Sequence, residues 1–332
     1  MTDLHERLET YLALRNQSRA FEQLTPDAST REYFRIHWNS GSAIACVYPE
    51  PFVAAEQSYL DVTNLFLSNG LPVANVLDFD ERLGIIVQED LGDTILRDGL
   101  TDATDSEREK LIDEAIGMIA KIQLATRNAY EIGSVASKLK FDVEKLLWEL
   151  DFFQAHYFGT FKKQPLSPAE TAAITEEFRE LAAELESRAS VLCHRDFHAA
   201  NIMIDPAGNL RIIDHQDARI GSAAYDLVSL VLDRITEPPP AEWLAAKRRL
   251  LIEERMKLGF AHLDDADFTY EFRLQTIQRC LKAIGTFSYQ SVNRGKTYFV
   301  PFIKPMFEIV LRAAENLDRL PNLQRIVKEQ LQ

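Results

Sequence analysis

The side chains best suited to chemistry lie between residues 191 and 218. This segment reads VLCHRDFHAANIMIDPAGNLRIIDHQDA and places an aspartate at Asp196, an asparagine at Asn201 and a second aspartate at Asp214. A carboxylate can accept a proton from a hydroxyl group. Carboxylate and amide oxygens are also ligands that the hard cation Mg²⁺ prefers. The segment therefore holds candidates for a general base and for a divalent-cation site.

A β-hairpin is expected to position these side chains. Residues 201–205 and 209–214 are short β-like runs, and Pro206-Ala207-Gly208 between them has the composition of a turn. Asn201 opens the first run and Asp214 closes the second. The hairpin would therefore bring both of them near Asp196, which directly precedes it.

The combined pattern resembles a known catalytic segment. His194-Arg195-Asp196, Asn201 and Asp214 are similar in order and spacing to the catalytic loop and metal-binding aspartate of protein kinases. The match is closer to the aminoglycoside-phosphotransferase-like small-molecule kinases. The resemblance implies that Asp196 orients an acceptor hydroxyl and accepts its proton, and that Asn201 and Asp214 hold the Mg²⁺ bound to ATP. In these families an aspartate at the place of Asp226 supports the catalytic loop; the local sequence would equally suit an ordinary acidic residue in a first helical turn.

The amino-terminal half departs from the protein-kinase pattern. No lysine precedes Lys110 and no glycine-rich loop is present; the string D-A-S-T-R-E-Y-F-R, residues 27–35, stands in its place. Ser29 and Thr30 offer hydroxyls and amides for a phosphate, and Arg31, favoured over Arg35, offers a bidentate guanidinium. Strand alternation would put the two arginines on one polar face, although such a face can also simply be solvated.

Three separate blocks carry a more specific resemblance. The string at 27–35, the segment at 191–218 and residues 278–287, QRCLKAIGTF, look like the bacterial anomeric kinases for N-acetylmuramate and N-acetylglucosamine. The resemblance implies ATP-dependent phosphorylation of the anomeric hydroxyl of these sugars during peptidoglycan recycling. It also implies a protein-kinase-like α+β fold, with a small antiparallel sheet and one helix in an N-terminal lobe and a mostly helical C-terminal lobe.

The same resemblance suggests further binding residues. Glu56 stands where a kinase glutamate would pair with the phosphate-binding cation, or it is a surface charge. Residues 88–91, including Glu89 and Leu91, would form the hinge that reads adenine. The acceptor would lie in the C-terminal lobe, near the residues Glu149, Asp217, Arg219, Arg279 and Lys282.

Charge bears on the identity of the acceptor. N-acetylmuramate carries a carboxylate and needs a cation, whereas an aminoglycoside needs carboxylates. Arg279 and Lys282 favour an anionic sugar, although two such residues on a helix are more often a solvated stripe. Glu149 could accept sugar hydroxyls, and the neighbouring Trp148, Phe152 and Phe153 are expected to be core residues.

Composition excludes other classes of protein. The 332 residues are 46% hydrophobic, with a formal net charge of −14, so the chain can build a core and does not favour nucleic acid or anionic membranes. No window approaches the roughly 20 apolar residues of a membrane span. The N-terminus lacks a targeting pattern, and the three cysteines lack disulfide or zinc spacing. A cytoplasmic protein is expected.

Periodicity predicts two lobes, and the resemblance assigns nucleotide binding to the first and acceptor binding to the second. The first, residues 1–90, would contain a leading helix over 2–16, strands over 31–38 and 42–48, a helix over 53–68 and strands over 75–78 and 83–89. The second comprises residues 91–332. Its helices are predicted at 108–127, 142–158, 168–188, 241–258, 268–290 and 302–317, interrupted by the single hairpin.

Three alternatives remain open at this stage. The chain could phosphorylate another small alcohol, such as an aminoglycoside, choline or another sugar. It could be a catalytically silent nucleotide-binding protein, which the missing lysine would favour and the intact Asp196, Asn201 and Asp214 oppose. It could also be a metal-dependent hydrolase, if His194, Asp196, His198, Asp214 and His215 formed a metal cluster; Asp214 and His215, adjacent at a strand end, should point in opposite directions.

Overall fold

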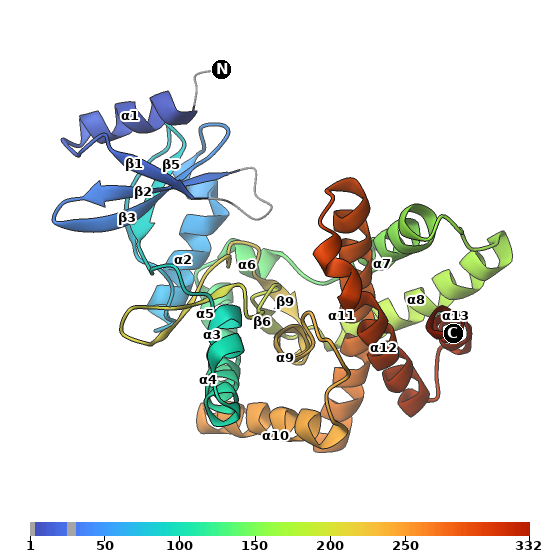
Figure 1. Cartoon of the computed structure of the whole chain (residues 1–332). Helices are drawn as coiled ribbons and strands as arrows, with labels where there is room; N and C mark the ends of the chain where they lie inside the picture. Colours follow the sequence, from blue (N-terminus) through green and yellow to red (C-terminus); the bar gives the residue numbers. More distant parts are fainter. Residues whose placement is uncertain (1–3, 25–30) are drawn as a thin grey trace. The chain divides into compact units, whose positions relative to one another are not determined.

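The computed structural model describes residues 4–24 and 31–332 of the chain (Figure 1). By its internal contacts the chain groups into two compact units. The first contains the chain up to Thr104 together with Ala200–Asp217, and the second contains Asp105–Ala199 and Ala218–Gln332. The division into a nucleotide-binding lobe over 1–90 and an acceptor-binding lobe over 91–332 stays a prediction, while the contacts place the predicted hairpin with the N-terminal part.

The first unit is built on one antiparallel sheet of five strands in the order β1-β2-β3-β5-β4. The strands expected at 31–38 and 42–48 are confirmed as a pair, with Glu32 opposite Val47 and Trp38 opposite Gly41. The strand nearest the N-terminus was not predicted. The elements of this unit are α1 (Leu4–Leu14), β1 (Phe21–Leu24), β2 (Glu32–Trp38), β3 (Gly41–Val47), a 3-10 turn η1 (Ala54–Glu56), α2 (Ser58–Ser68), β4 (Val76–Asp80), β5 (Ile85–Glu89), α3 (Leu96–Asp102), β7 (Ile202–Ile204) and β8 (Leu210–Ile212).

Alternation along β2 sorts its side chains as predicted. Phe34 and Ile36 are buried on the face covered by α1, where they pack with Leu8 and Leu12. The opposite face meets α2, because Tyr59 of that helix donates a hydrogen bond to Gln88 of β5. Figure 1 shows the two helices on the two faces of the sheet. Burial of one face against α1 fixes the register, since a shift by one residue would turn the arginines into the core.

The hairpin of β7 and β8 is joined to the first unit by backbone contacts. Ile202 pairs with Ile212, as expected for an antiparallel turn, and Gly208 in the turn has a positive φ of 86°. The amide of Ile204 donates to Thr94, and that of Ile212 donates to Pro72. These bonds explain why residues 200–217 group with the N-terminal part of the chain.

The second unit is mostly helical. Each of the six predicted helices is present; the one expected at 168–188 has these bounds, and Ser167 and Glu170 form a capping box at its start. The hairpin is not the only strand pair in the helical part of the sequence, because β6 and β9 also form a short antiparallel pair. The elements are α4 (Asp105–Leu124), α5 (Thr126–Glu131), α6 (Val135–Lys138), α7 (Val143–Phe153), a π-helix η2 (Gln154–Phe161), α8 (Pro168–Arg188), β6 (Val191–Cys193), β9 (Arg219–Gly221), α9 (Tyr225–Val231), α10 (Ala241–Lys257), α11 (Asp265–Asn293), a 3-10 turn η3 (Thr297–Phe302), α12 (Ile303–Leu317) and α13 (Pro321–Leu331).

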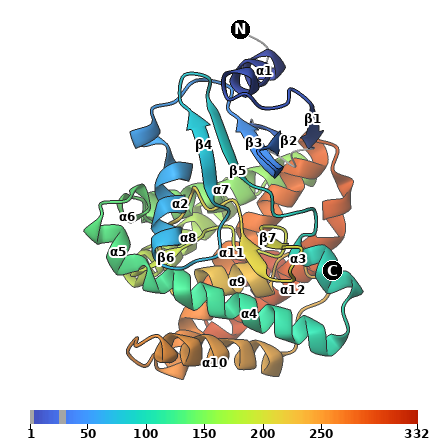
Figure 2. The ribbon, with the colours of Figure 1, turned by 90° about the vertical axis from the view of Figure 1, so that its left-hand side faces the viewer.

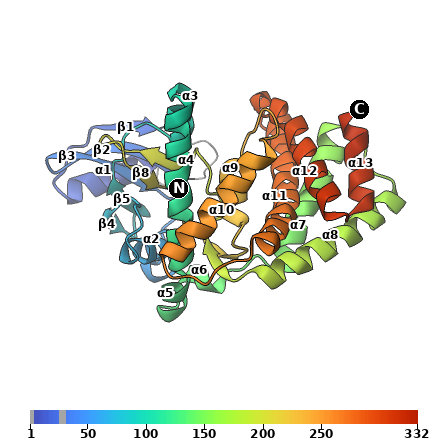
Figure 3. The same ribbon diagram turned by 90° about the horizontal axis from the view of Figure 1, so that it is seen from below.

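The long helix α11 organises this unit. It packs against α7, α9 and α12, while α8 contacts α7 and α13, and Figure 3 shows these helices gathered around α11. Figure 2 shows α10 running beside α4, where Lys247 is paired with Glu109 and Asp113. At Gly285 a Cβ would lie 2.7 Å from the Cα of Phe153. Helices α7 and α11 can therefore approach closely only because residue 285 has no side chain.

Candidate functional site

The loop carrying Asp196 is fixed by a buried carboxylate in the second unit. Asp226 on α9 accepts hydrogen bonds from the backbone amides of His194, at 2.7 Å, and Arg195, at 3.1 Å. Arg195 has a positive φ of 86°, a conformation that costs about 1 kcal/mol or more in a residue with a side chain. The two hydrogen bonds offset that cost. Asp226 therefore has the supporting position that the resemblance to kinases implied.

Asp196 lies among positive charges. The ammonium of Lys282 is 3.3 Å from its Oδ1, and guanidinium nitrogens of Arg279 and Arg195 lie 3.4 Å and 3.7 Å from its carboxylate. Burial raises the pKa of Asp196, but the charges of Lys282 and Arg279 outweigh this and hold it far below the usual range. The carboxylate is therefore ionised and is a weak base. Arg279 and Lys282 form no solvated stripe; that alternative is wrong.

A second carboxylate is buried beside Lys282. The side chain of Glu149 on α7 is inaccessible to solvent, and its Oε1 lies 3.8 Å from both Lys282 and Lys145. Its Oε2 accepts a hydrogen bond of 2.8 Å from Gln278. Lys282 thus contacts Asp196 and Glu149 at once. Burial and the charge of Arg279 lower the pKa of Lys282, while the two carboxylates oppose that shift.

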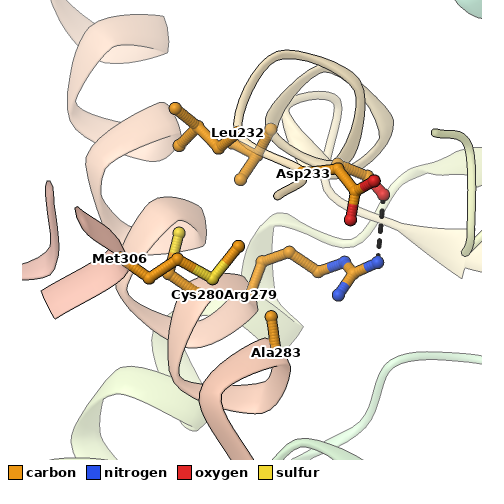
Figure 4. A pocket seen from close by; sticks show the side chains of 8 residues that line it. Leu232, Asp233, Arg279, Cys280, Ala283 and Met306 are labelled. Atoms are coloured by element: carbon orange, nitrogen blue, oxygen red, sulfur yellow. Dashed lines mark hydrogen bonds between the residues drawn. The ribbon is translucent and has the colours of Figure 1, made fainter. Parts of the chain in front are cut away.

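Several polar atoms around Asp196 have hydrogen-bonding capacity that no neighbour uses. Glu149 Oε1, the Tyr225 hydroxyl and Arg279 Nε are buried, and within residues 4–24 and 31–332 none of them makes a hydrogen bond. Burial, followed by the charge of Glu149, raises the pKa of Tyr225. Figure 4 shows the Arg279 side chain beside Asp233, on the wall of a small pocket that Cys280 and Met306 also line. Buried polar atoms without a hydrogen bond are uncommon in native proteins, and a bound water, ion or ligand can complete them.

Asp214, the candidate metal ligand, lies in the first unit. It follows β8 with a positive φ of 61°, and its side chain is 44% exposed. Its carboxylate accepts hydrogen bonds from Gln216, at 2.8 Å, and Asn201, at 3.4 Å. One carboxylate and one amide are a sufficient protein donor set for Mg²⁺ that binds chiefly water and phosphate oxygens. The residues present therefore fit such an ion.

The next residue anchors Asp214 in the fold. His215 is buried, and its Nε2 shares a hydrogen bond of 2.7 Å with Thr63 of α2. Its ring lies against Tyr59 and Phe66 of the same helix, with centroid distances of 5.0 Å and 5.3 Å. Asp214 and His215 do have different environments, as expected. The anchoring role of His215 was missed, because nothing in the sequence links it to α2.

The two candidate arginines on β2 have different partners. Arg31 is largely buried, and its guanidinium lies 3.7 Å from Asp214. Arg35 instead makes hydrogen bonds of 2.8 Å with Asp90 and 2.6 Å with Asp93. Neither side chain belongs to a merely solvated face. Of the two, Arg31 is the one placed beside the candidate metal ligand.

The other residues predicted to bind nucleotide differ in their exposure and in their partners. Ser29 and Thr30 lie outside the described residues. Glu56 is exposed and lies in the 3-10 turn before α2, not in the helix, which begins only at Ser58, and its carboxylate makes no ion pair with the described residues. Glu89 forms an ion pair of 2.8 Å with Arg211, so its carboxylate has a structural partner. Leu91 is buried, and the hinge role of both residues stays a prediction.

Predicted acceptor residues are also distributed unevenly. Glu149, Arg279 and Lys282 gather around Asp196 as described. Arg219 is buried in β9, where its guanidinium lies 5.3 Å from the ring centroid of Phe141. Asp217 is the last residue of the first unit, and its acceptor role stays a prediction.

One expectation about the aromatic residues of α7 is wrong. Phe153 is buried as predicted, but Trp148 is 57% exposed. Helical spacing alone does not reveal which side of α7 is covered by α11, and this is why Trp148 was assigned to the core.

The alternative metal cluster is not supported. Across residues 4–24 and 31–332, no three histidine, cysteine, aspartate or glutamate side chains come together as a set that could hold a metal ion.

In the same ranges, none of the helices combines the length and apolar character needed to cross a membrane. Cys46, Cys193 and Cys280 are buried and are not joined in disulfides.

Comparison with known proteins identifies the family. The model of the phosphotransferase enzyme family, APH, matches residues 20–259, and the chain belongs to this family. An N-acetylmuramate/N-acetylglucosamine kinase of Neisseria meningitidis is 28% identical over 91% of this chain and 88% of its own length. A protein of the same name from Caulobacter vibrioides is 28% identical over 84% of this chain and 74% of its own length.

Solved structures agree on the fold. The ADP-bound aminoglycoside phosphotransferase APH(2'')-Ib superposes with a TM-score of 0.58 at 14% identity, covering 93% of this chain and 98% of that protein. The predicted protein-kinase-like α+β fold is thus confirmed. The chain is a phosphotransferase for a small-molecule alcohol.

Proposed function

We propose that this phosphotransferase transfers the γ-phosphoryl group of ATP to the anomeric hydroxyl of N-acetylmuramate or N-acetylglucosamine. The observation that carries the proposal is the position of Asp196, ionised and held by Lys282 and Arg279 beside the buried Glu149. The shared name of the two relatives supports the choice of sugar. Such a product would serve the recycling of peptidoglycan sugars in the cytoplasm.

The weak basicity of Asp196 suits this acceptor. Phosphoryl transfer passes through a loose transition state, so the attacking hydroxyl needs orientation more than strong deprotonation. An anomeric hydroxyl is more acidic than an ordinary alcohol and requires less help from a base. Asp196 would accept a hydrogen bond from this hydroxyl and finally its proton. Lys282 and Arg279 would hold the Asp196 carboxylate in position for this hydrogen bond through their ion pairs with it.

The nucleotide residues lie in the first unit. Asn201 and Asp214 would hold Mg²⁺, which when bound neutralises charge on the phosphates of ATP. Arg31 would supply the cation that a lysine supplies in protein kinases, because it is the largely buried arginine beside Asp214. Ser29 and Thr30 are adjacent in sequence and could add hydroxyl contacts, with Glu89 and Leu91 at the hinge.

The charge of the acceptor site opposes two alternative acceptors, and the conformation of the catalytic loop opposes a catalytically silent protein. An aminoglycoside is polycationic and would be repelled by Lys282 and Arg279. Choline carries a quaternary ammonium and meets the same objection. A silent nucleotide-binding protein would have no chemical need for the costly loop conformation at Arg195 that sets up Asp196.

A direct assay tests the proposal. ADP release would be measured with Mg-ATP and a panel of N-acetylmuramate, N-acetylglucosamine, simple hexoses, choline and kanamycin, with Asp196→Asn protein as the blank. Phosphorus NMR would then locate the phosphate. We expect transfer to an N-acetylated amino sugar and a signal at its anomeric carbon. Transfer only to choline or kanamycin, or to a different hydroxyl of the sugar, would refute the proposal.

A further inference from the structure

One buried side of α11 is lined by polar residues. Glu271, Gln275, Gln278 and Lys282 follow one another at spacings of four, three and four, which place them on one face of the helix. The first three are at most 7% exposed, and the side chain of Lys282 is 14% exposed. The inward face of a helix normally carries apolar side chains. Burial of polar groups costs free energy unless they are hydrogen-bonded, so the partners of these residues bear on their role.

Two of these residues belong to a chain of hydrogen bonds that ends on Glu149. The hydroxyl of Ser222 donates to Gln275 Oε1 at 2.9 Å, and Gln275 Nε2 donates to Gln278 Oε1 at 2.9 Å. Gln278 Nε2 then donates to Glu149 Oε2 at 2.8 Å. All four side chains are buried. The three bonds therefore run from the residue after β9 through α11 to α7, two packed helices that can be followed in Figure 3.

The charged end of this chain fixes the direction of both amides. A carboxylate only accepts hydrogen bonds, so Gln278 must turn its NH2 group towards Glu149 and its oxygen towards Gln275. Gln275 must then donate to Gln278, which leaves its own oxygen for the Ser222 hydroxyl. One arrangement of the two glutamines satisfies all their neighbours. The chain therefore holds the Glu149 carboxylate in one orientation.

The other oxygen of Glu149 leads to the reacting carboxylate. Glu149 Oε1 lies 3.8 Å from the ammonium of Lys282, and also 3.8 Å from that of Lys145 one turn earlier on α7. Lys282 in turn donates to Asp196 Oδ1 at 3.3 Å. Burial lowers the pKa of Lys282, whereas Asp196 and Glu149 favour its charged form. A change in the orientation of Glu149 would therefore reach Asp196 through the Lys282 ammonium.

The first residue of the chain lies beside the base of the catalytic loop. The thiol of Cys193, directly before His194, donates to the backbone carbonyl of Ser222 at 3.4 Å. The hydrogen bonds thus start next to the strand that enters the loop and end on the ion pair that holds Asp196. Stability alone does not call for amides at these positions, because well-packed apolar residues in place of a buried polar network are often neutral or stabilising.

We propose that Gln278 is a positioning residue for phosphoryl transfer, which orients the Glu149 carboxylate so that it holds the Lys282 ammonium against Asp196. Gln275 and Ser222 fix the amide of Gln278 in turn. The assignment rests on the proposed function, in which Asp196 orients and deprotonates the acceptor hydroxyl. Gln278 acts on Asp196 through Glu149 and Lys282.

Matched variants on α11 test this assignment. The kcat at saturating Mg-ATP and N-acetylmuramate or N-acetylglucosamine would be compared in unmodified, Gln278→Met and Thr276→Val proteins. Methionine has nearly the length of glutamine but cannot donate to Glu149. Thr276 is the control, because it is buried on the same helix and its hydroxyl donates to the Phe272 carbonyl within α11.

The expected loss is confined to catalysis. Gln278→Met should lower kcat about tenfold to a hundredfold, the effect of a small displacement of a catalytic group. Its affinity for Mg-ATP and the number of binding sites, both measured by calorimetry, should stay normal, which excludes a loss of folded protein. Thr276→Val should keep the normal kcat. An unchanged kcat in Gln278→Met would overturn the assignment.

A double-mutant cycle shows whether Gln278 acts through Glu149. Gln278→Met would be introduced into Glu149→Gln protein, in which the carboxylate to be oriented is gone. The second substitution should then cause little further loss of kcat. A loss of equal size in both backgrounds would mean that Gln278 only packs α11 against α7, and the assignment would fail.

Gln275→Met gives the same comparison if Gln278→Met does not fold. It removes the donor that fixes the Gln278 amide and leaves Gln278 and Glu149 in place. The kcat should fall by a smaller factor than in a protein without the Gln278 amide, and only while Glu149 is present. A normal kcat in Gln275→Met would then count against the assignment.

Failure of the proposed function would be separately visible. If the unmodified protein phosphorylates neither sugar, that proposal fails, and crystal structures of the full chain decide the positioning role. In Gln278→Met, or in Gln275→Met in its place, we expect a rotated Glu149 carboxylate and a Lys282 ammonium displaced from Asp196. An unaltered contact between Lys282 and Asp196 would overturn the assignment, whatever the acceptor.

Discussion

The guanidinium of Arg31 lies 3.7 Å from the carboxylate of Asp214. This contact joins the start of β2 to the end of the β7–β8 hairpin within the first unit. No lysine precedes Lys110 in this chain, so the lysine that binds phosphates in protein kinases has no counterpart on the sheet. Arg31 already sits beside the candidate metal ligand and can take that place.

Replacing Arg31 should weaken nucleotide binding. In Arg31→Ala the affinity for Mg-ATP, measured by calorimetry, should fall about tenfold to a hundredfold, because a charge-assisted contact contributes about 1.5–3 kcal/mol. Arg31→Lys should recover part of it, since the charge remains but the bidentate geometry is lost.

Arg35→Ala is the matched control on the same strand. It removes the arginine that pairs with the partly buried Asp90, so it should lower the free energy of unfolding by about 1 kcal/mol while nucleotide affinity stays close to normal. Equal affinity loss in both alanine variants would argue that Arg31 has no special role.

Asp196 and Asp214 should separate catalysis from nucleotide binding. Asp196→Asn removes the carboxylate that would orient and deprotonate the acceptor, and kcat should fall by about 10²–10⁴-fold with Mg-ATP affinity retained. Asp214→Ala should lose both turnover and Mg-ATP affinity, because it would remove a metal ligand. Calorimetric titration with Mg-ATP, alongside the ADP-release assay, distinguishes these outcomes, and normal turnover in either protein contradicts the mechanism.

Asp226 should make stability and activity depend on pH in opposite directions. Burial raises its pKa from 3.8 to about 6; the charge of Asp196 adds to this, while the His194 ring and the two amide hydrogen bonds oppose it. The native state therefore holds this proton more tightly than the unfolded chain. The stability that Asp226 provides is complete below about pH 4 and is lost as pH rises through about 6, a change of about 3 kcal/mol.

The comparison with Asp226→Asn isolates this effect. The free energy of unfolding of the unmodified protein, relative to the variant, should fall between pH 4 and pH 6. The activity of the unmodified protein should instead rise over this pH range. The ionised carboxylate accepts hydrogen bonds from both the His194 and Arg195 amides, whereas protonation occupies one of its oxygens. A parallel pH dependence of stability in the two proteins would rule out the assignment.

Local patterns made much of this fold predictable. The β7–β8 hairpin follows from two apolar runs around a turn, and α8 follows from its helical periodicity; the structure adds a capping box at its start. The pair β6 and β9 could not be found in this way, because strands of three residues carry no periodic signal and their pairing is not local. Asp196, Asn201 and Asp214 were singled out because their order and spacing resemble a kinase catalytic segment, and their catalytic and metal-binding roles stay predictions.

Features set by tertiary contacts were harder to predict. Arg279 and Lys282 face Asp196 only because α11 presents that side inward, and an identical spacing on an exposed helix would be solvated. Trp148 was assigned to the core because helical spacing does not show that its side of α7 is left uncovered. The spacing of Lys145, Trp148 and Glu149 along α7 was visible in the sequence, but the partner of each depends on where α11 crosses.

The helix crossing itself gives the last prediction. A methyl group at residue 285 would lie 2.7 Å from the backbone of Phe153, too close for α7 and α11 to keep their separation. Gly285→Ala should therefore lower the free energy of unfolding by about 1–3 kcal/mol. It should also raise KM for the acceptor, because Glu149 and Lys282 on the two helices would move apart.

Gly117→Ala provides the control for this prediction. Gly117 is also inside a helix, but its added Cβ would meet Glu254 at an ordinary 3.8 Å. Alanine there removes the flexibility of glycine and should stabilise the protein by about 0.5–1 kcal/mol without affecting KM. Thermal unfolding and acceptor kinetics of both variants check this contrast. A Gly285→Ala protein as stable as Gly117→Ala, with an unchanged acceptor KM, would mean that the crossing tolerates the methyl group and does not position Glu149.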